Sequence, residues 1–430
     1  MLPEKKNKLV HNFFSLGAVQ AISSLIQLIV IPHVISKIGV DGYGVVAVAQ
    51  VVMFYLAVFT DYGFNLTATR DIALYKADQI KISEIFFRVL FSKLFLCIVT
   101  FILLLILLLF IPLFRIHLLL YCMAFAFVVG QSILVTWFFQ GLERMHFIAF
   151  ATLIARVLFA ILVFLFIRDK DDDFLFLFFL GVGNIIAGLI SIVAAFRIYK
   201  LKFIKPARPD IIHEFKEGWQ VTITNFSITT CQYIGIIILR IFTNDLVVGY
   251  YSIAEKIYFA MKVMLGTFSQ VIYPRVCQLV QQGRTQMILF FRQTYIPFLA
   301  VVLTGSTLVF IFPGQILYFF IGYNHESTSL LLRIMCVATV IVCLNIPAYL
   351  VLLAANRKKS YLRIFTIGTL LNLFANIILV HFFEATGTVM SVIITELFIT
   401  VGLCWEVYRL YVYNKNEGGN FLKSLFYESN

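Results

Sequence analysis

Apolar residues run along most of this chain, and short polar segments divide them into stretches of about 20 residues. A helix needs roughly 20 apolar residues to cross the hydrocarbon core of a bilayer. The pattern therefore predicts an all-α polytopic membrane protein with about twelve transmembrane helices. They are expected near residues 12–34, 44–68, 89–111, 118–140, 148–167, 174–196, 219–242, 249–272, 295–312, 331–354, 364–383 and 388–410.

The second and eighth predicted spans begin with the same residue types at the same spacing. The matching residues are Gly42, Tyr43 and Ala47 in one span and Gly249, Tyr250 and Ala254 in the other. Six spans in each half then start from the same side, as in a parallel internal repeat. We expect two six-helix lobes around a central cavity, at residues 1–200 and 219–410, with a basic cytoplasmic linker at 201–218 and a cytoplasmic tail at 411–430.

Composition supports a membrane protein and narrows its chemistry. The chain is 61% hydrophobic and 13% charged, whereas soluble proteins carry roughly 25% charged residues. Its seven cysteines lie in or beside apolar stretches without a CxxC pair, so we expect core residues and no metal site. We expect no cofactor, and the absence of a GxxxxGK[ST] loop disfavours a nucleotide-driven pump.

The net charge of +12 is explained by membrane orientation better than by nucleic acid. With a cytoplasmic N-terminus, roughly 24 lysines and arginines fall in cytoplasmic segments and roughly 4 in outer loops. Both termini are then cytoplasmic, and the acidic loop from Arg168 to Asp173 lies outside. The first span lacks a small-residue cleavage site, so we expect it to be retained.

Four segments carry a resemblance to a known family. They are TDYGFNLTATRDIA at Thr60–Ala73, followed by a basic amphipathic run, WFFQGLERM at Trp137–Met145, VGYYSIAEKI at Val248–Ile257 and NIPAYLVLLAANRKKSYLR at Asn345–Arg363. In these segments, and along nearly its whole length, the chain resembles bacterial polysaccharide repeat-unit flippases. These are the Wzx-type O-antigen transporters of the multidrug/oligosaccharidyl-lipid/polysaccharide exporter superfamily.

The resemblance implies a two-lobed flippase of the bacterial inner membrane. Its implied substrate is an undecaprenyl-diphosphate-linked oligosaccharide, moved to the periplasmic leaflet by alternating access and powered by an ion gradient. A polysaccharide polymerase and a chain-length regulator are the partners that this role suggests, beside membrane lipid.

Deep cations are the first candidates for substrate binding. Arg156 and Lys262 lie well inside predicted spans, where a charge is costly and usually functional. An arginine can bind the oxygens of a diphosphate bidentately. The alternative for Arg156 is a structural role within its own lobe. Arg240, at the outer end of its span, is either an interface anchor or a residue at the cavity mouth.

Polar residues in the second predicted span form another set of candidates. Asn65 and Gln50 carry amides that can bond sugar hydroxyls, or can join helices as polar side chains often do in bundles. Gly63, in the same span, permits close helix contact or bending.

Three acids are candidates for ion coupling, because a carboxylate in a dry site can take up and release a proton. They are Asp61, Glu396 and Glu255. Asp61 can instead pair with Arg70 or bond threonine hydroxyls. We expect Lys93, near the inner end of its span, to extend toward the membrane surface.

Two other functions compete with a flippase. A drug or metabolite antiporter of the same superfamily shares the expected fold, but the Thr60–Ala73 segment argues against it. A polytopic O-antigen polymerase or glycosyltransferase needs sizeable outer loops, and the predicted outer loops here are short. The sequence therefore favours a transporter over an enzyme.

Overall fold

The computed structural model describes the backbone of residues 3–206 and 208–416. It also describes the side chains of residues 22–410, except those at positions 24, 207, 208, 213, 281, 282, 284 and 358. Within these ranges every regular element is a helix. The last fourteen residues of the predicted tail, 417–430, lie outside the described residues.

The described chain divides into two compact units. The first unit contains the chain up to Arg240 together with Asp245–Gly249, and the second contains Ile241–Asn244 and the chain from Tyr250 onward. The helix predicted at 219–242 thus packs with the first unit, and residues 208–218 of the predicted linker are already helical. The lobe boundaries expected from the repeat remain a prediction, because compactness does not bear on repeat symmetry.

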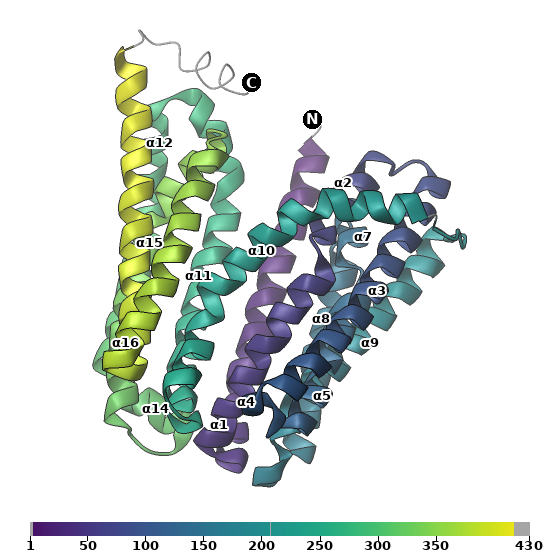
Figure 1. Cartoon of the computed structure of the whole chain (residues 1–430). Helices are drawn as coiled ribbons and strands as arrows, with labels where there is room; N and C mark the ends of the chain where they lie inside the picture. Colours follow the sequence, from purple (N-terminus) through teal and green to yellow (C-terminus); the bar gives the residue numbers. More distant parts are fainter. Residues whose placement is uncertain (1–2, 207, 417–430) are drawn as a thin grey trace. The chain divides into compact units, whose positions relative to one another are not determined.

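The first unit is a bundle of helices, several of which are short (Figure 1). They are α1 (Pro3–Asp61), α2 (Phe64–Leu74), α3 (Gln79–Phe110), α4 (Pro112–Arg115), α5 (Leu118–Ala124), α6 (Ala126–Ile133), α7 (Thr136–Gly141), α8 (His146–Phe166), η1 (Lys170–Asp172), α9 (Asp173–Tyr199) and α10 (Arg208–Phe242).

The second unit combines long and short helices. They are α11 (Asp245–Gln282), which begins in the first unit, then α12 (Arg284–Phe290), the π-helix η2 (Phe291–Tyr295), α13 (Ile296–Ile311), α14 (Pro313–Ile321), α15 (Glu326–Ala354) and α16 (Lys358–Asn416).

Helix length and composition confirm an all-α polytopic membrane protein. Across the described residues, nine helices are long and apolar enough to cross a membrane. Two of these helical stretches, 25–74 and 359–410, contain 50 and 52 residues, and each is long enough to cross twice. Their helices change direction at Gly39 (φ 81°) and Glu384 (φ 48°). With α11, which is long but carries several charges, the total agrees with the twelve predicted spans.

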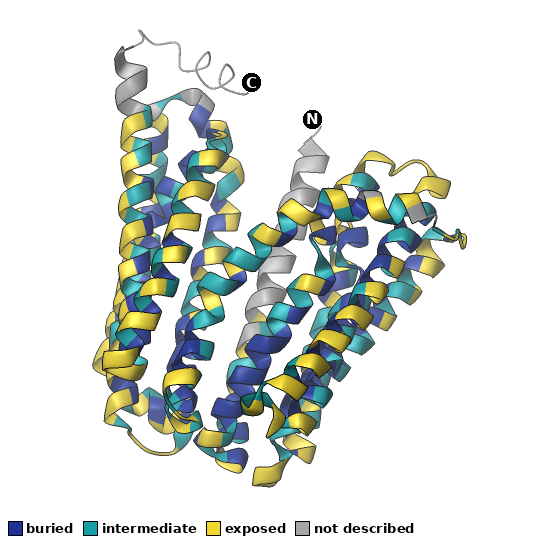
Figure 2. Cartoon of the chain, viewed as in Figure 1, coloured by how far each residue is buried: buried dark blue, intermediate teal, exposed yellow. Residues whose placement is uncertain are grey.

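Exposed apolar side chains follow the outer faces of several helices. α3 has a mean hydropathy of 3.0 in its most apolar window, yet only 22% of that window is buried. Figure 2 shows the exposed positions along α3 and α16. Such large exposed apolar surfaces are unusual in water and expected in lipid. The chain is therefore a multi-pass membrane protein.

Aromatic residues fill the main core of the first unit. Trp137, Phe138 and Phe139 of α7 are fully buried and pack with Phe64 of α2 and Phe86 of α3. The ring centroids of Phe86 and Phe138 are 5.2 Å apart in an edge-on arrangement, which aromatic pairs prefer. The WFF part of the Trp137–Met145 segment thus has a packing role, and it fixes α7 against α2.

Candidate functional site

A backbone break between α1 and α2 shapes the polar part of the first unit. Tyr62 (φ 45°) and Gly63 (φ 72°) both adopt left-handed conformations, which interrupt the helix predicted at 44–68. A Cβ at Gly63 would lie 2.7 Å from the Cβ of Val221 and 2.9 Å from the carbonyl oxygen of Gly218. Only glycine fits both the conformation and this close approach. The break therefore brings α10 against the end of α1.

A polar cavity of about 360 Å³ lies beside this break, between α1, α2, α6 and α10. Its polar lining consists of Asp61, Asn65, Gln131, Asn225, Thr229 and Tyr233. The volume falls within the range of small-molecule binding pockets, roughly 300–1,000 Å³. Such a group of hydrogen-bonding side chains is unexpected in an apolar bundle, so this first-unit cavity is the main candidate site.

Helical spacing explains how α10 contributes to the cavity. Asn225, Thr229 and Tyr233 are four residues apart and share one helix face. None of these three residues was among the candidates predicted from the sequence, and neither was Gln131. The signal was present, since the run from Asn225 to Thr230 contains four residues with amide or hydroxyl side chains in a membrane span.

The Asp61 carboxylate is held by a buried lysine. Lys93 Nζ donates to Asp61 Oδ1 at 3.0 Å, and the Lys93 side chain is only 2% exposed. The expectation that Lys93 extends to the membrane surface is wrong, because the carboxylate supplies a partner within the bundle. The suggested Asp61–Arg70 pairing is also wrong, because the break at Gly63 carries Arg70 away on α2, where it bonds Asp71 and Glu217.

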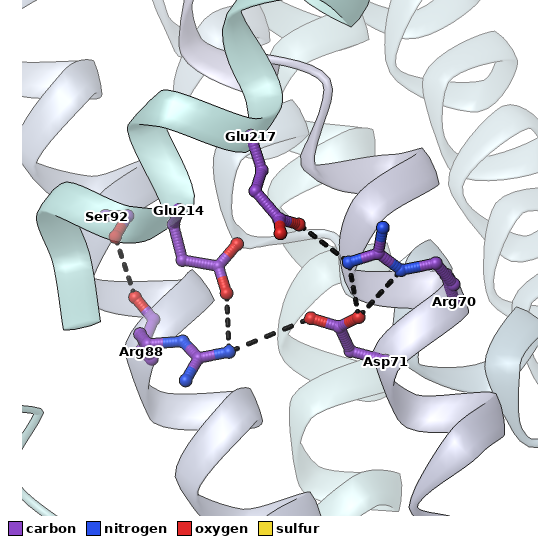
Figure 3. Close-up of polar contacts among 6 residues, drawn as sticks. All are labelled: Arg70, Asp71, Arg88, Ser92, Glu214 and Glu217. Atoms are coloured by element: carbon purple, nitrogen blue, oxygen red, sulfur yellow. Dashed lines mark hydrogen bonds and ion pairs between the residues drawn. The ribbon is translucent and has the colours of Figure 1, made fainter.

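A charged network anchors the beginning of α10 to α2 and α3, and we call it the α10 anchor network (Figure 3). Arg88 Nη2 lies 2.5 Å from Glu214 Oε1 and 3.8 Å from Asp71 Oδ2. Arg70 Nη2 lies 2.6 Å from Glu217 Oε2, and its Nε donates to Asp71 Oδ1 at 3.0 Å. Because α10 also supplies one wall of the cavity, this network helps to position the cavity residues.

Arg156 lies at the middle of α8, ten residues from either end. It is partly buried, and its Nη1 atom is buried without a hydrogen-bond partner among the described residues. A buried unpaired guanidinium nitrogen costs free energy. Among the predicted binding residues, Arg156 is therefore the one with a buried donor that a ligand would satisfy.

Gln50 and Arg240 lie in different surroundings. Gln50 is buried on α1, one turn before Phe54, and so on the same helix face as the cavity residues Phe54 and Asp61. Arg240 donates two hydrogen bonds to Asp245, from Nε to Oδ1 at 2.5 Å and from Nη2 to Oδ2 at 3.0 Å. The charge of Arg240 is therefore balanced at the connection between α10 and α11.

In the second unit, the structure brings two predicted residues together. Lys262 Nζ of α11 donates to Glu396 Oε1 of α16 at 3.1 Å and lies 5.3 Å from the centre of the Tyr258 ring. Lys262 is 29% exposed, so this lysine remains accessible. Glu255 is buried on α11, seven residues before Lys262 and on the same helix face.

No group of three or more histidines, cysteines, aspartates or glutamates suited to a metal ion occurs among the described residues. Amides, hydroxyls and fixed charges can bind a polar ligand.

Comparison with known proteins gives consistent matches. A family model described as "Polysaccharide biosynthesis protein" matches residues 9–280. Two curated relatives are each described as "Putative O-antigen transporter". The Escherichia coli (strain K12) protein is 26% identical over 397 residues, covering 92% of this chain and 95% of its own. The Shigella dysenteriae protein is 26% identical over 400 residues, covering 91% of this chain and 98% of its own.

Solved structures share the fold at low sequence identity. An inward-facing multidrug resistance MATE family transporter of the MOP superfamily superposes with a TM-score of 0.68 at 15% identity, covering 94% of this chain and 99% of that chain. The lipid II flippase MurJ, in its inward closed conformation, has the same TM-score and identity. This match covers 91% of this chain and 87% of that chain. At these identities the likeness establishes the fold alone.

Proposed function

Because the chain belongs to the polysaccharide biosynthesis protein family, we propose that it is a flippase for lipid-linked glycans. It moves undecaprenyl-diphosphate-linked oligosaccharide repeat units, of O-antigen or capsule type, from the cytoplasmic to the periplasmic leaflet of the bacterial inner membrane. The names of the two curated relatives support this substrate class. The positive charge of the predicted inner loops supports cytoplasmic termini.

The observation that carries the proposal is the polar cavity inside an apolar unit. A glycan headgroup must cross about 30 Å of hydrocarbon, where its hydroxyls would lose their hydrogen bonds to water. Asn65, Gln131 and Asn225 can replace some of those bonds. A protein of this family needs such a surface if it transports a sugar.

The diphosphate requires cations, and two predicted residues suit it. Arg156 has a buried nitrogen without a partner among the described residues, and Lys262 is partly exposed beside Glu396. A phosphate oxygen that binds Lys262 would compete with Glu396. The released carboxylate could then take up a proton or sodium ion, which links substrate binding to ion binding.

Among the three coupling candidates, Glu396 suits this exchange best. Asp61 is held by Lys93, and loss of its charge would leave a buried ammonium group without its partner. Glu255 is buried near the same face of α11 as Lys262 and serves as a second candidate. We propose alternating access as the transport cycle, with a polymerase and a chain-length regulator acting on the flipped glycan.

The test is the sidedness of lipid-linked oligosaccharide in cells that lack this chain, measured with a glycan-cleaving enzyme confined to the periplasm. We expect intermediates to accumulate and to resist the enzyme, since they stay in the cytoplasmic leaflet. Re-expression of the chain should restore cleavage. Accumulated intermediates that are fully accessible would contradict a flippase and favour a polymerase, and no accumulation in cells without a second flippase would favour a drug or metabolite antiporter.

A further inference from the structure

The charge on the wall of the first-unit cavity is balanced. Among the described residues that line it, Asp61 is the only carboxylate, and none is a lysine or an arginine. The partner of Asp61 is Lys93, whose Nζ lies 3.0 Å from the carboxylate and whose side chain is almost fully buried. The lysine therefore cancels the charge of the wall without itself facing the cavity.

Three aromatic rings form the apolar part of the same wall together with Ala57, Val58 and Ile228. The ring of Phe54 lies 4.9 Å from that of Tyr233 and 5.5 Å from that of Phe127, measured between centroids. Flat apolar ring faces can pack against the C–H faces of a sugar ring, and the electron-rich face of an aromatic ring attracts the weakly positive hydrogens there. An aromatic wall therefore suits a sugar ring.

The polar part of the wall offers both donors and acceptors. Asn65, Gln131 and Asn225 each present an amide, and Thr229 presents a hydroxyl. An amide or hydroxyl side chain can both donate and accept, as can the hydroxyl and acetamido groups of a sugar. A carboxylate on a ligand can only accept hydrogen bonds, and a cation binds it best.

We propose that the first-unit cavity selects an uncharged sugar residue of the lipid-linked glycan. The ligand class is a neutral hexose or N-acetylhexosamine, bound by the aromatic rings of Phe54, Phe127 and Tyr233 and by the surrounding amides. This inference rests on the proposed flippase function and adds a substrate preference to it. An acidic sugar such as a hexuronate is disfavoured, because it would face Asp61 without a lysine or arginine among the described lining residues.

The experiment uses reporter cells that lack their own flippase and produce the full chain. One strain makes a neutral repeat unit, and a matched strain makes the same unit with one hexose replaced by a hexuronate. Periplasmic cleavage of the lipid-linked intermediates reports how fast each is flipped. We expect the neutral unit to be flipped roughly tenfold faster or more.

Variants of the ion pair change the charge of the wall in both directions. Asp61→Asn leaves Lys93 unbalanced, so the preference for the neutral unit should shrink. Lys93→Met leaves the carboxylate unbalanced, so the preference should grow. The double variant Asp61→Asn/Lys93→Met is neutral again and should restore the wild-type preference. Lys76→Met, in an exposed pair with Glu143, removes a charge elsewhere and should leave the preference unchanged.

Asn225→Lys provides a second variant if the buried-pair variants fail to reach the membrane. It adds a cation to the cavity wall, so flipping of the hexuronate unit should become faster relative to flipping of the neutral unit. Equal rates for both units in the wild type, or an unchanged preference in both Asp61→Asn and Asn225→Lys, would overturn the charge selection while leaving the flippase intact. If neither unit is flipped although the chain is in the membrane, the proposed function itself fails.

Discussion

Two lysine–carboxylate pairs, one in each unit, have nearly the same length but different surroundings. Lys93 and Asp61 in the first unit are 3.0 Å apart, and Lys262 and Glu396 in the second are 3.1 Å apart. The Lys93 side chain is 2% exposed, whereas that of Lys262 is 29% exposed. Distance alone would suggest equal roles. Burial shows that only the second lysine is open to another partner.

The difference separates a fixed charge from an exchangeable one. Breaking a buried pair leaves an unpaired charge in a poorly solvated site, whereas water or a ligand can replace a partner at an accessible site. We therefore assign the first pair to the shape and neutrality of the cavity, and the second pair to exchange with the substrate.

The largest expected effect comes from breaking the buried pair. Asp61→Ala should destabilise the protein by about 3–5 kcal/mol, because it leaves Lys93 buried and charged. The double variant Asp61→Ala/Lys93→Met should recover most of that loss. Thermal unfolding in detergent measures both. Equal midpoints for Asp61→Ala and the wild type would contradict the assignment of this pair.

A second contrast lies within the α10 anchor network. Glu214 is 2% exposed and bonded to Arg88, whereas Glu217 is 35% exposed and bonded to Arg70. Glu214→Ala should cost about 2–3 kcal/mol, since Asp71 still lies 3.8 Å from Arg88. Glu217→Ala, the matched control, should cost about 1 kcal/mol or less. The two unfolding midpoints decide whether burial controls the difference, and a larger cost for Glu217→Ala would refute it.

The accessible pair should show the reverse balance between stability and transport. Lys262→Met should change stability by on the order of 1 kcal/mol, because Lys262 is partly exposed. Flipping should fall roughly tenfold or more, as expected when a charged hydrogen bond of about 1.5–3 kcal/mol is lost. Parallel measurements of unfolding and of periplasmic glycan cleavage test this. Strong destabilisation with normal flipping would reverse the assignment of the two pairs.

Arg156 provides the smallest expected effect on stability. Its Nη1 has no partner among the described residues, so Arg156→Met should leave the unfolding midpoint unchanged or slightly raised. Flipping should nevertheless fall, and Arg156→Lys should retain part of it through the remaining charge. A large loss of stability in Arg156→Met would show that this arginine has a structural role instead.

The sequence was most informative about helices and family. Length and apolar character predicted the twelve spans, and the family match confirms the resemblance that began with the Thr60–Ala73 segment. The polar pattern of the second predicted span also pointed to Asp61 and Asn65, which the structure places at one cavity. Their role in transport remains a prediction.

The contacts between distant segments were harder to predict. Lys93 looked able to reach the surface, because nothing in its local sequence shows that Asp61, 32 residues earlier, lies beside it. The break at Tyr62–Gly63 decides that pairing, since it redirects Arg70. The contribution of α10 required knowing that Gly63 and Gly218 let two backbones approach closely. Such contacts depend on tertiary packing rather than on local pattern.

The most direct test of the central claim is flipping by the purified chain in sealed vesicles. Undecaprenyl-diphosphate-linked neutral oligosaccharide would be placed in both leaflets, under an imposed proton or sodium gradient, with a membrane-impermeant glycosidase outside. We predict that vesicles containing the chain reach nearly complete cleavage, because oligosaccharide from the inner leaflet is flipped outward and then cut. An Asn65→Ala/Asn225→Ala variant should slow this second phase of cleavage. Cleavage that stops once the oligosaccharide of the outer leaflet is consumed, as in vesicles without protein, would contradict a flippase.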